Sequence, residues 1–322
     1  MPESVTAAFS EPEHFDTALR AEGYRSFLVR TPRQFRTRLT QVTLNDMRFS
    51  AAEERVSRVA FVVVPANVLL IMFSIGRARA PICGGMPLSE GEFVTFGPGE
   101  QFHARTEGAS RWATIRLAAN VLSGYSDALV DGAFSILPGT RRWRPSSRGA
   151  RDIRSLHAAA IRMAVQHPEV LVDPEAAHGL EQQLLHAVLK CFSELSPEPE
   201  VKAVRRHQET MLRFEHLLWR IEGKAPSLTE ICAELQVRER HLRMLCADHL
   251  GMSPTSYERL RRVWLVHHTL LDLARLPECV SKAVRDHGFN DLGRFAANYR
   301  EIFGETPSST LHRSRARANM LV

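Results

Sequence analysis

The hydrophobic residues between positions 35 and 118 come in short runs that are rich in β-branched and aromatic side chains. Sequences such as Pro65-Ala66-Asn67 and Gly97-Pro98-Gly99 separate these runs, and both are of kinds that reverse the direction of a chain. The pattern therefore predicts an antiparallel sheet that is rolled into a barrel or folded into a sandwich. The clearest runs are Val59–Val64, Val68–Phe73, Phe93–Phe96 and Trp112–Leu117.

A helical period replaces the strand pattern after a stretch rich in Pro, Ser and Arg at residues 138–148. Apolar residues recur every three or four positions from Ile153 to Ala164 and again from Leu180 to Phe192. This spacing predicts two amphipathic helices. Residues 193–200 then contain two prolines and three acidic residues. Such a segment neither continues a helix nor buries apolar surface, so we expect a linker there.

From Val204 onward the pattern is helical, and one arrangement occurs twice. In its first occurrence Ser227 precedes Glu230 by three positions, which is the pattern of a capping box at the start of a helix. The apolar face of this helix ends at Leu235, and a second amphipathic helix follows after a break at Gln236-Val237. The spacing predicts a helix-turn-helix unit.

The second helix of this unit leaves a mainly charged set of side chains on its outer face, near its N-terminal end. A DNA recognition helix needs this arrangement, because its N-terminal residues contact the base edges in the major groove. Arginine can donate two hydrogen bonds to guanine O6 and N7 there, and the helix dipole favours a nearby phosphate. The outward residues are Arg238, Glu239, Arg240, Arg243 and Met244.

The same plan returns about 50 residues later, where Gly288 is expected to supply the turn and Phe289 to pack beneath it. Aromatic residues at the following helical positions predict a buried side. A long helix is expected over Tyr257–Leu276 between the units, and it is able to hold the two recognition helices about one DNA turn apart. The outward residues of the second unit are Asn290, Leu292, Gly293, Arg294 and Ala297.

Residues 204–312 resemble the AraC/XylS family of transcription regulators. The resemblance rests on the order and spacing of two helix-turn-helix units and on three motifs: Leu250-Gly251-Met252-Ser253-Pro254, Gly288-Phe289-Asn290 and Phe303-Gly304-Glu305-Thr306-Pro307. It implies a DNA-binding domain. The family's base-contacting positions fall on Arg240, Arg243 and Met244 in the first unit and on Leu292, Gly293, Arg294 and Ala297 in the second.

The second unit departs from the family's usual pattern. It has Ala283-Val284 where the family shows a large apolar residue followed by alanine, and Thr310 where an aromatic residue is usual. Arg294 is the only strong hydrogen-bonding side chain among the outward residues that correspond to base contacts. We therefore expect the first unit to read bases and the second to contribute mainly phosphate contact and shape recognition.

The segment Leu88–His103 is similar to the strand-turn-strand of the cupin-like sensing and dimerisation region that precedes such a DNA-binding domain. This similarity implies an N-terminal cupin-like β-barrel that carries two helices. A barrel of this size can enclose one small ligand, although each candidate lining residue also fits an ordinary core. The candidates are Met72, Phe96, His103 and Trp112. The helix at Leu180–Phe192 has two open interpretations, pairing with its copy in a homodimer and packing against its own barrel.

The fold class is thus α+β, with an all-α C-terminal domain whose two helix-turn-helix units are joined by a long helix. The expected divisions are a sensing and dimerisation domain at 1–192, a linker at 193–203, the DNA-binding domain at 204–312 and a basic tail at 313–322. The tail either touches the phosphate backbone or is a disordered end.

Charge adds one observation to this picture. Residues 1–200 contain 22 basic and 22 acidic residues, whereas residues 201–322 contain 20 and 14, so the whole net charge of +6 lies in the C-terminal part. A basic domain favours a polyanionic partner. The five cysteines form no CxxC pair or zinc-ligand pattern, and the N-terminus has no apolar signal segment, so we expect reduced core thiols and a cytoplasmic protein.

These observations predict a transcription regulator that is not an enzyme and needs no metal or other cofactor. The resemblance to the family implies that it acts as an activator. Its expected partners are double-stranded promoter DNA, RNA polymerase, a small-molecule effector and a second copy of itself, with no membrane. Two alternatives stay open. One is a metal-dependent cupin enzyme with an appended DNA-binding domain, although only His103 and Glu100 lie near each other in the strand region. The other is a regulator that responds to no signal.

Overall fold

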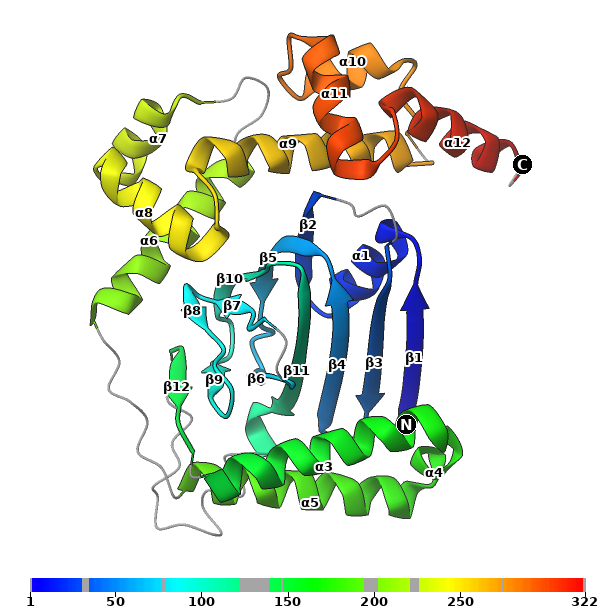
Figure 1. Ribbon diagram of the computed structural model, residues 1–322, viewed down its shortest axis with the longest axis vertical. Coiled ribbons are helices and arrows are strands. Elements are labelled where there is room, and N and C mark those ends of the chain that lie inside the picture. Colours follow the sequence, from blue (N-terminus) through cyan, green and yellow to red (C-terminus); the bar gives the residue numbers. More distant parts are fainter. Residues whose placement is uncertain are drawn as a thin grey trace.

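The computed structural model describes residues 2–30, 35–76, 79–121, 139–145, 147–193, 202–220, 226–273 and 275–320. In Figure 1 the strands lie between the C-terminal helices at the top and a layer formed by α3 (Ser147–Gln166), α4 (Pro168–Val172) and α5 (Pro174–Ser193) at the bottom. The remaining helices are α1 (Pro12–Ala21), α6 (Lys202–Arg220), α7 (Leu228–Leu235), α8 (Glu239–Leu250), α9 (Pro254–Leu271), α10 (Val280–Asp286), α11 (Leu292–Phe303) and α12 (Pro307–Met320).

The strands form two antiparallel sheets, one with the order β1-β3-β4-β11-β6-β9-β12 and the other with the order β2-β5-β10-β7-β8. Their bounds are β1 (Glu3–Phe9), β2 (Tyr24–Arg30), β3 (Thr37–Thr43), β4 (Met47–Arg55), β5 (Ser57–Val63), β6 (Val68–Ser74), β7 (Ile82–Cys83), β8 (Met86–Pro87), β9 (Phe93–Phe96), β10 (Gln101–Thr106), β11 (Ala109–Ala118) and β12 (Arg141–Trp143).

The central strands of the seven-stranded sheet are buried on both faces, with alternate side chains in two different cores. Along β6, Leu70 and Met72 belong to the core between the two sheets. Ile71 and Phe73 of the same strand belong to a second core, which the sheet forms with α3 and α5. Burial on both faces explains the uninterrupted hydrophobic run Val68–Phe73.

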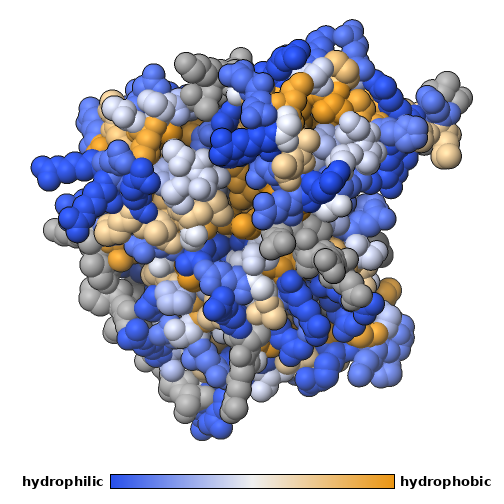
Figure 2. All heavy atoms as spheres, turned by 45° about the horizontal axis from the view of Figure 1, so that its top comes forward, coloured by the Kyte–Doolittle hydropathy of each residue, from blue (hydrophilic) through white to orange (hydrophobic). Residues whose placement is uncertain are grey.

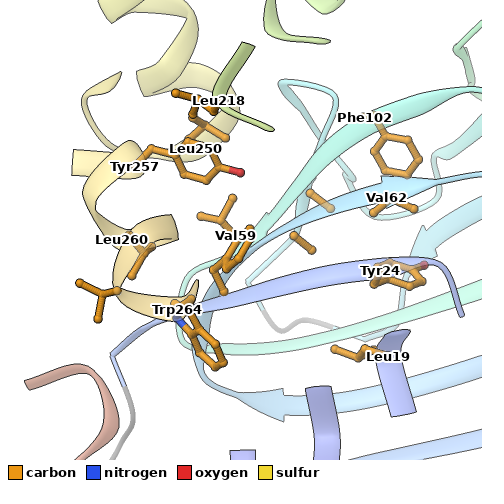
Figure 3. Close-up of a cluster of buried hydrophobic side chains, with 14 of the residues drawn as sticks. Leu19, Tyr24, Val59, Val62, Phe102, Leu218, Leu250, Tyr257, Leu260 and Trp264 are labelled. Atoms are coloured by element: carbon orange, nitrogen blue, oxygen red, sulfur yellow. The ribbon is translucent and has the colours of Figure 1, made fainter. Parts of the chain in front are cut away.

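The five-stranded sheet lies between the other sheet and the C-terminal helices. Phe102 of β10 faces inward and stacks on Phe96 with ring centroids 3.5 Å apart. Phe27 of β2 faces the other way and contacts Tyr257 and Trp264 of α9 edge-on. Figure 3 shows side chains of α8 and α9 packed against residues of this sheet, so the core of the N-terminal region continues into the C-terminal helices.

A buried ion pair lies inside the sandwich. Arg58 Nε donates to Glu54 Oε2 at 2.8 Å, and the side chains of Trp112 and Ser110 also donate to Glu54. Burial lowers the pKa of the Arg58 guanidinium, but the charge of Glu54 and its hydrogen bonds outweigh this effect and raise the pKa above its usual value. The partners offset part of the desolvation cost of the two charges, which is large for an unpaired ion.

The architecture confirms an α+β chain with a sheet-rich N-terminal part and a helical C-terminal part. The described strands do not close into a barrel, so the predicted closed barrel is not confirmed. The sequence reasoning also missed β1, α1 and β2, which together precede the predicted strand region. The apolar face of α5 packs on its own sheet through buried residues such as Leu184 and Val188, which favours the second interpretation of this helix.

The C-terminal end differs from the expected tail, since α12 crosses the predicted boundary at 312–313 and continues to Met320. Arg313 pairs with Glu305 at 2.7 Å, and Arg315 donates to backbone oxygens before α10. These two arginines are therefore part of the folded domain. Most of the predicted linker, residues 194–201, lies outside the described residues. Four cysteines are buried as expected, but Cys279 is exposed.

Replacement of Ile115 by alanine tests the core on the helical side of the seven-stranded sheet. Ile115 is 0% exposed, so we expect the change to lower the free energy of unfolding by about 2–5 kcal/mol, measured by urea denaturation. Val63 on the other sheet is 38% exposed, and Val63→Ala is the matched control, with an expected change within about 0.5 kcal/mol. Similar losses in both variants would contradict this assignment of the core.

Candidate nucleic-acid interface

The first helix-turn-helix unit is built from local signals. The Ser227 hydroxyl accepts a hydrogen bond from the Glu230 backbone N–H, and the Glu230 carboxylate accepts one from the Ser227 N–H at 2.6 Å, so the predicted capping box is present. Helix α7 ends at Leu235, and its C-cap Gln236 adopts a left-handed conformation with φ 57°. After Val237 and the N-cap Arg238, α8 begins at Glu239. The short turn thus sets the start of the predicted recognition helix.

All five predicted residues of this helix start are exposed: Arg238, Glu239, Arg240, Arg243 and Met244. Arg243 is paired with Glu239 one turn earlier, with Nη2 2.7 Å from Oε1. A pair of this exposed i,i+4 kind contributes only about 0.3–0.5 kcal/mol. Glu239 therefore orients the guanidinium without holding it strongly, and both exposed side chains are accessible to another partner.

The second unit repeats this construction. Gly288 has φ 76° in the turn after α10, and the Asp291 carboxylate accepts a hydrogen bond from the Arg294 N–H at the start of α11. Leu292 is half-buried against the core. The other predicted contact residues, Asn290, Gly293, Arg294 and Ala297, are exposed.

The long helix α9 fixes the second turn directly. Arg262 donates to the carbonyl oxygens of His287 and Gly288 at 3.2 and 3.3 Å, and its guanidinium lies 4.6 Å from the ring centroid of Phe289. Arg262 also pairs with Glu258 on its own helix. Helix α9 ends at Leu271, five residues before the predicted end. A single helix therefore holds the turn of the second unit.

A buried carboxylate joins the C-terminal helices to the N-terminal sheet. Glu215 of α6 is fully buried. His103 Nε2 of β10 lies 3.0 Å from Glu215 Oε2, and the Tyr257 hydroxyl of α9 donates to the same oxygen at 2.8 Å. Trp219 Nε1 donates to Oε1 at 2.8 Å, and Arg261 Nε lies 3.7 Å from it. Three elements therefore meet at one side chain.

Burial alone would raise the pKa of Glu215, because a charged carboxylate is poorly solvated in the protein interior. The hydrogen bond and charge of His103, the charge of Arg261 and the Tyr257 hydroxyl reverse this effect and lower the pKa below its usual value. Glu215 is thus ionised in the folded protein. Its charge stabilises the contact only while β10, α6 and α9 keep their positions.

A second polar contact joins α1 to the second unit. Glu13 Oε1 lies 3.5 Å from His267 Nε2 of α9 and 3.7 Å from Arg313 Nη2 of α12. Burial raises the pKa of Glu13, but the hydrogen bond to His267, a backbone hydrogen bond and the two positive neighbours outweigh it and bring the pKa to about 2. The N-terminal part therefore contacts both ends of α9.

The turn between β7 and β8 lies against the His249 side chain of α8. Gly85 has φ 78°, a left-handed conformation that favours glycine, and a Cβ atom there would lie 2.7 Å from His249 Nε2. A larger residue would therefore strain the backbone and displace the buried His249 imidazole.

The contacts between the two parts leave the predicted DNA-reading residues uncovered. The sheet meets α8 at His249 and Leu250, near its C-terminal end, while the arginines lie near its N-terminal end. In the view of Figure 2, many hydrophilic side chains project from the face that carries the C-terminal helices, with hydrophobic ones gathered between them. Helix α11 also contacts β2, but its predicted contact residues other than the half-buried Leu292 are exposed.

The four predicted ligand-lining residues do not come together around one pocket. Met72, Phe96 and Trp112 are buried between the two sheets, where Trp112 donates to Glu54. His103 lies on the opposite face of β10 and contacts Glu215. None of the four lines a described hollow. Among the residues that the structure covers, no three His, Cys, Asp or Glu side chains converge as metal ligands.

The sequence reasoning missed Glu215, Tyr257 and Arg261 as a connected group. One signal was present, because Glu215 is an acidic residue within the apolar face that includes Met211, Phe214 and Leu218 of α6. An acid in that position requires a buried partner. The partner from β10 was not predictable, because it is 112 positions away in the chain.

Among the described residues, no helix combines the length and the apolar character that a membrane-spanning segment requires.

Comparison with known proteins gives a family match within the C-terminal part. Residues 231–313 match a family described as a helix-turn-helix domain. The XylDLEGF operon transcriptional activator 3 of Pseudomonas putida is 37% identical over 105 residues, which are 32% of this chain and 32% of that protein. The XylDLEGF operon transcriptional activator of the same organism is 35% identical over 89 residues, 28% of each chain. The matches thus span less than a third of these relatives.

Solved structures were aligned over larger parts of the chain. The AraC-like transcriptional activator CuxR is aligned over 81% of this chain and 94% of its own, with 15% sequence identity and a TM-score of 0.44.

The Glu215 contact gives a stability prediction. Glu215→Gln removes a buried charge that faces Arg261 and His103, so we expect the free energy of unfolding to fall by about 3–5 kcal/mol, measured by urea denaturation of the full chain. Glu209→Gln on the same helix is the control. Glu209 pairs with Arg205 on the surface, so its loss should cost at most about 1 kcal/mol. Equal costs would show that the Glu215 network adds nothing beyond a surface pair.

His249 gives a prediction of pH dependence. Burial, followed by the positive neighbours His103, His207 and Arg105, lowers the pKa of His249 to about 3. In the unfolded chain this histidine takes up a proton near pH 6.5. Stability due to neutral His249 is therefore present above about pH 6.5 and is lost as the pH falls toward 3. The free energy of unfolding of His249→Asn should fall less steeply between about pH 6 and 4, by up to about 1.4 kcal/mol per pH unit. Identical slopes would contradict the assignment.

Proposed function

We propose that the protein is a sequence-specific DNA-binding regulator of transcription of the AraC/XylS type, and that it acts as an activator. The match of residues 231–313 to a helix-turn-helix domain supports this proposal. One observation carries this proposal. Two helix-turn-helix units stand in tandem, each with its recognition helix exposed at the start, and neither is covered by the rest of the chain.

Helix α9 gives the two units a spacing that suits DNA. Its 18 residues span about 27 Å at about 1.5 Å per residue, and it connects directly to α8 at one end. Successive major grooves on one face of a duplex are about 34 Å apart. Helix α8 of the first unit and helices α10 and α12 of the second contact α9, which supports insertion of both recognition helices into adjacent grooves.

The first unit is proposed to read base sequence. Arg240 and Arg243 carry guanidinium groups that match guanine O6 and N7, and Glu239 can accept a hydrogen bond from cytosine N4. Arg238 at the helix N-cap is placed for phosphate contact, and the exposed Met244 for apolar contact with a base.

The second unit is proposed to contribute position and shape. Gly293 lies in the first turn of α11, and a Cβ atom there would meet only Asp291 Oδ1, at 3.6 Å. The fold does not need glycine at this position, so its lack of a side chain suits close approach to the DNA backbone. Arg294 can then contact phosphate, while Asn290, Leu292 and Ala297 lie alongside the groove.

Residues 1–192 are proposed as the sensing and dimerisation domain of cupin-like origin, residues 193–203 as the linker and residues 204–312, extended by α12, as the DNA-binding domain. A homodimer would match two DNA half-sites. Its contact surface must differ from the apolar face of α5, because that face is already buried. RNA polymerase and a small-molecule effector are the remaining proposed partners.

The alternative to a regulator without enzymatic activity is a metal-dependent cupin enzyme with an appended DNA-binding domain. Its cupin histidine would be His103, whose Nε2 lies 3.0 Å from Glu215, and this contact favours a structural role. Metal analysis of the purified protein separates the two proposals, since stoichiometric iron, manganese or zinc would support the enzyme.

The DNA-binding proposal is tested by selecting bound sequences from random duplexes with the full chain and measuring their dissociation constants by fluorescence anisotropy. We expect Arg243→Ala to reduce the preference for the selected site over random DNA by about 5- to 150-fold, which corresponds to the 1–3 kcal/mol of one bidentate base contact. We expect Arg294→Ala to weaken binding to both DNAs to a similar extent.

Arg148 lies exposed on α3, on the far side of the sheets, and Arg148→Ala serves as the control with unchanged binding. If the wild-type chain prefers no sequence over random competitor at moderate salt, the proposed function is wrong. Equal losses of discrimination from Arg294→Ala and Arg243→Ala would contradict only the division of labour between the units.

A further inference from the structure

Three exposed arginines form a cationic surface at one corner of the seven-stranded sheet. Arg38 lies on β3, Arg55 is the last residue of β4, and Arg36 directly precedes β3. All three line a hollow of about 480 Å³ beside the end of β1. We call these three residues the arginine patch.

The single acidic residue that lines this hollow already has a partner. Glu53 accepts a hydrogen bond from Arg111 of β11, with Nη2 2.5 Å from Oε1. This hydrogen bond and the charge of Arg111, together with the charges of Arg38 and Arg55, lower the pKa of Glu53 below its usual value. The arginines of the patch form no ion pair with another described residue. The patch therefore presents three positive charges whose partners must come from elsewhere.

Helix α1 connects the arginine patch to the second helix-turn-helix unit. Phe15 of α1 packs against Phe9 and Phe35 beside the patch, with ring centroids 5.4 and 6.0 Å apart. Two residues earlier on the same helix, Glu13 lies 3.7 Å from Arg313 of α12. Figure 1 shows α1 near the ends of β1 and β3 that point toward the C-terminal helices. The patch thus belongs to the N-terminal part but lies close to the second unit.

Helix α12 carries further positive charge between the patch and the second unit. Arg315 and Arg317 are exposed on this helix. Arg315 donates to the backbone oxygens of Pro277 and Glu278, which orient its guanidinium without cancelling its charge. Helix α12 contacts both α10 and α11. Positive charge therefore extends from the second unit to the corner of the sheet.

A nucleic-acid backbone matches the chemistry of the patch. A guanidinium group can donate paired hydrogen bonds to phosphate oxygens. Neighbouring strands of a sheet lie about 4.8 Å apart, and each DNA strand carries a phosphate about every 3.4 Å along the helix axis. One segment of backbone can therefore contact arginines from both β3 and β4. Contacts of this kind add affinity but carry no sequence information.

We propose that the arginine patch binds the phosphate backbone of DNA that flanks the site read by the two helix-turn-helix units, on the side of the second unit. The N-terminal part then contributes directly to DNA affinity without reading bases. This inference rests on the proposed function, because it assumes that α8 and α11 hold the duplex beside the patch.

The test is fluorescence anisotropy of the full chain with three duplexes. One contains only the selected site, and the other two extend it at one end or the other by about 20 base pairs of random sequence, which span about 68 Å. We expect one extension, and not the other, to lower the dissociation constant at least about tenfold at 50 mM salt. Each neutralised phosphate adds about 0.9 to the slope of log affinity against log salt, so this extension should steepen the slope by about 2–3.

The triple variant Arg36→Gln/Arg38→Gln/Arg55→Gln should bind the unextended site as the wild type does. It should lose both the gain from the extension and the added salt dependence. Arg36→Lys/Arg38→Lys/Arg55→Lys keeps the positive charges, so it should retain most of the added slope. If urea denaturation shows that the glutamine variant is unfolded, Arg38→Gln alone replaces it, with an expected change in slope of about 0.9.

The matched control is Arg148→Gln/Arg151→Gln/Lys190→Gln, which removes the same net charge. These three exposed residues lie near the start of α3 and the end of α5. In Figure 1 those helix ends lie beside β12, at the opposite edge of the seven-stranded sheet from β1. The control should keep the full gain from the extension, because its lost charges are far from the patch.

Three results would overturn the inference: no gain from either extension with the wild type, equal gains from both, or equal losses in the patch and control variants. A wild-type chain that prefers the selected site but ignores its flanks contradicts this inference and leaves the proposed function in place. A chain that prefers no sequence over random competitor contradicts the proposed function itself.

Discussion

The structure depends on one ionised carboxylate that is removed from water. Glu215 is fully buried, and an isolated charge in the interior would cost several kcal/mol. It is retained because His103, Tyr257, Trp219 and Arg261 supply hydrogen bonds and compensating charge from both parts of the chain. Separation of the sheet from α6 would remove one of these partners. The buried charge therefore couples the position of the sheet to that of the C-terminal helices.

Features that depend on local sequence were predictable, whereas contacts between distant residues were not. Both helix-turn-helix units were predictable, because capping at Ser227, the turn at Gly288 and the apolar spacing are local signals. The strand region was predictable as antiparallel sheet for a similar reason. The association of His103 with Glu215 was not, since it joins residues that are far apart in sequence. The closed barrel was inferred by analogy, and the pairing of the strands follows another pattern.

The interior of the sandwich explains why the predicted ligand-lining residues are core residues. Phe96 stacks on Phe102, and Tyr24 lies parallel to Trp112 at 5.9 Å. The buried ion pair of Glu54 and Arg58 occupies another part of the same interior. Aromatic and β-branched patterns in a sequence indicate which side chains face inward, but they do not indicate whether the enclosed space is filled. Packing density decides that question, and here the space between the sheets is occupied.

Helix α9 has a geometric consequence under the proposed DNA-binding function. It carries the second turn through Arg262 and has no break among its 18 residues. Each inserted base pair turns one half of a DNA element by about 34–36° relative to the other. A rigid connection between the two recognition helices would not follow that rotation. The spacing between the two halves of a DNA site would then matter as much as their sequences, because an inserted base pair would place one half on another side of the duplex.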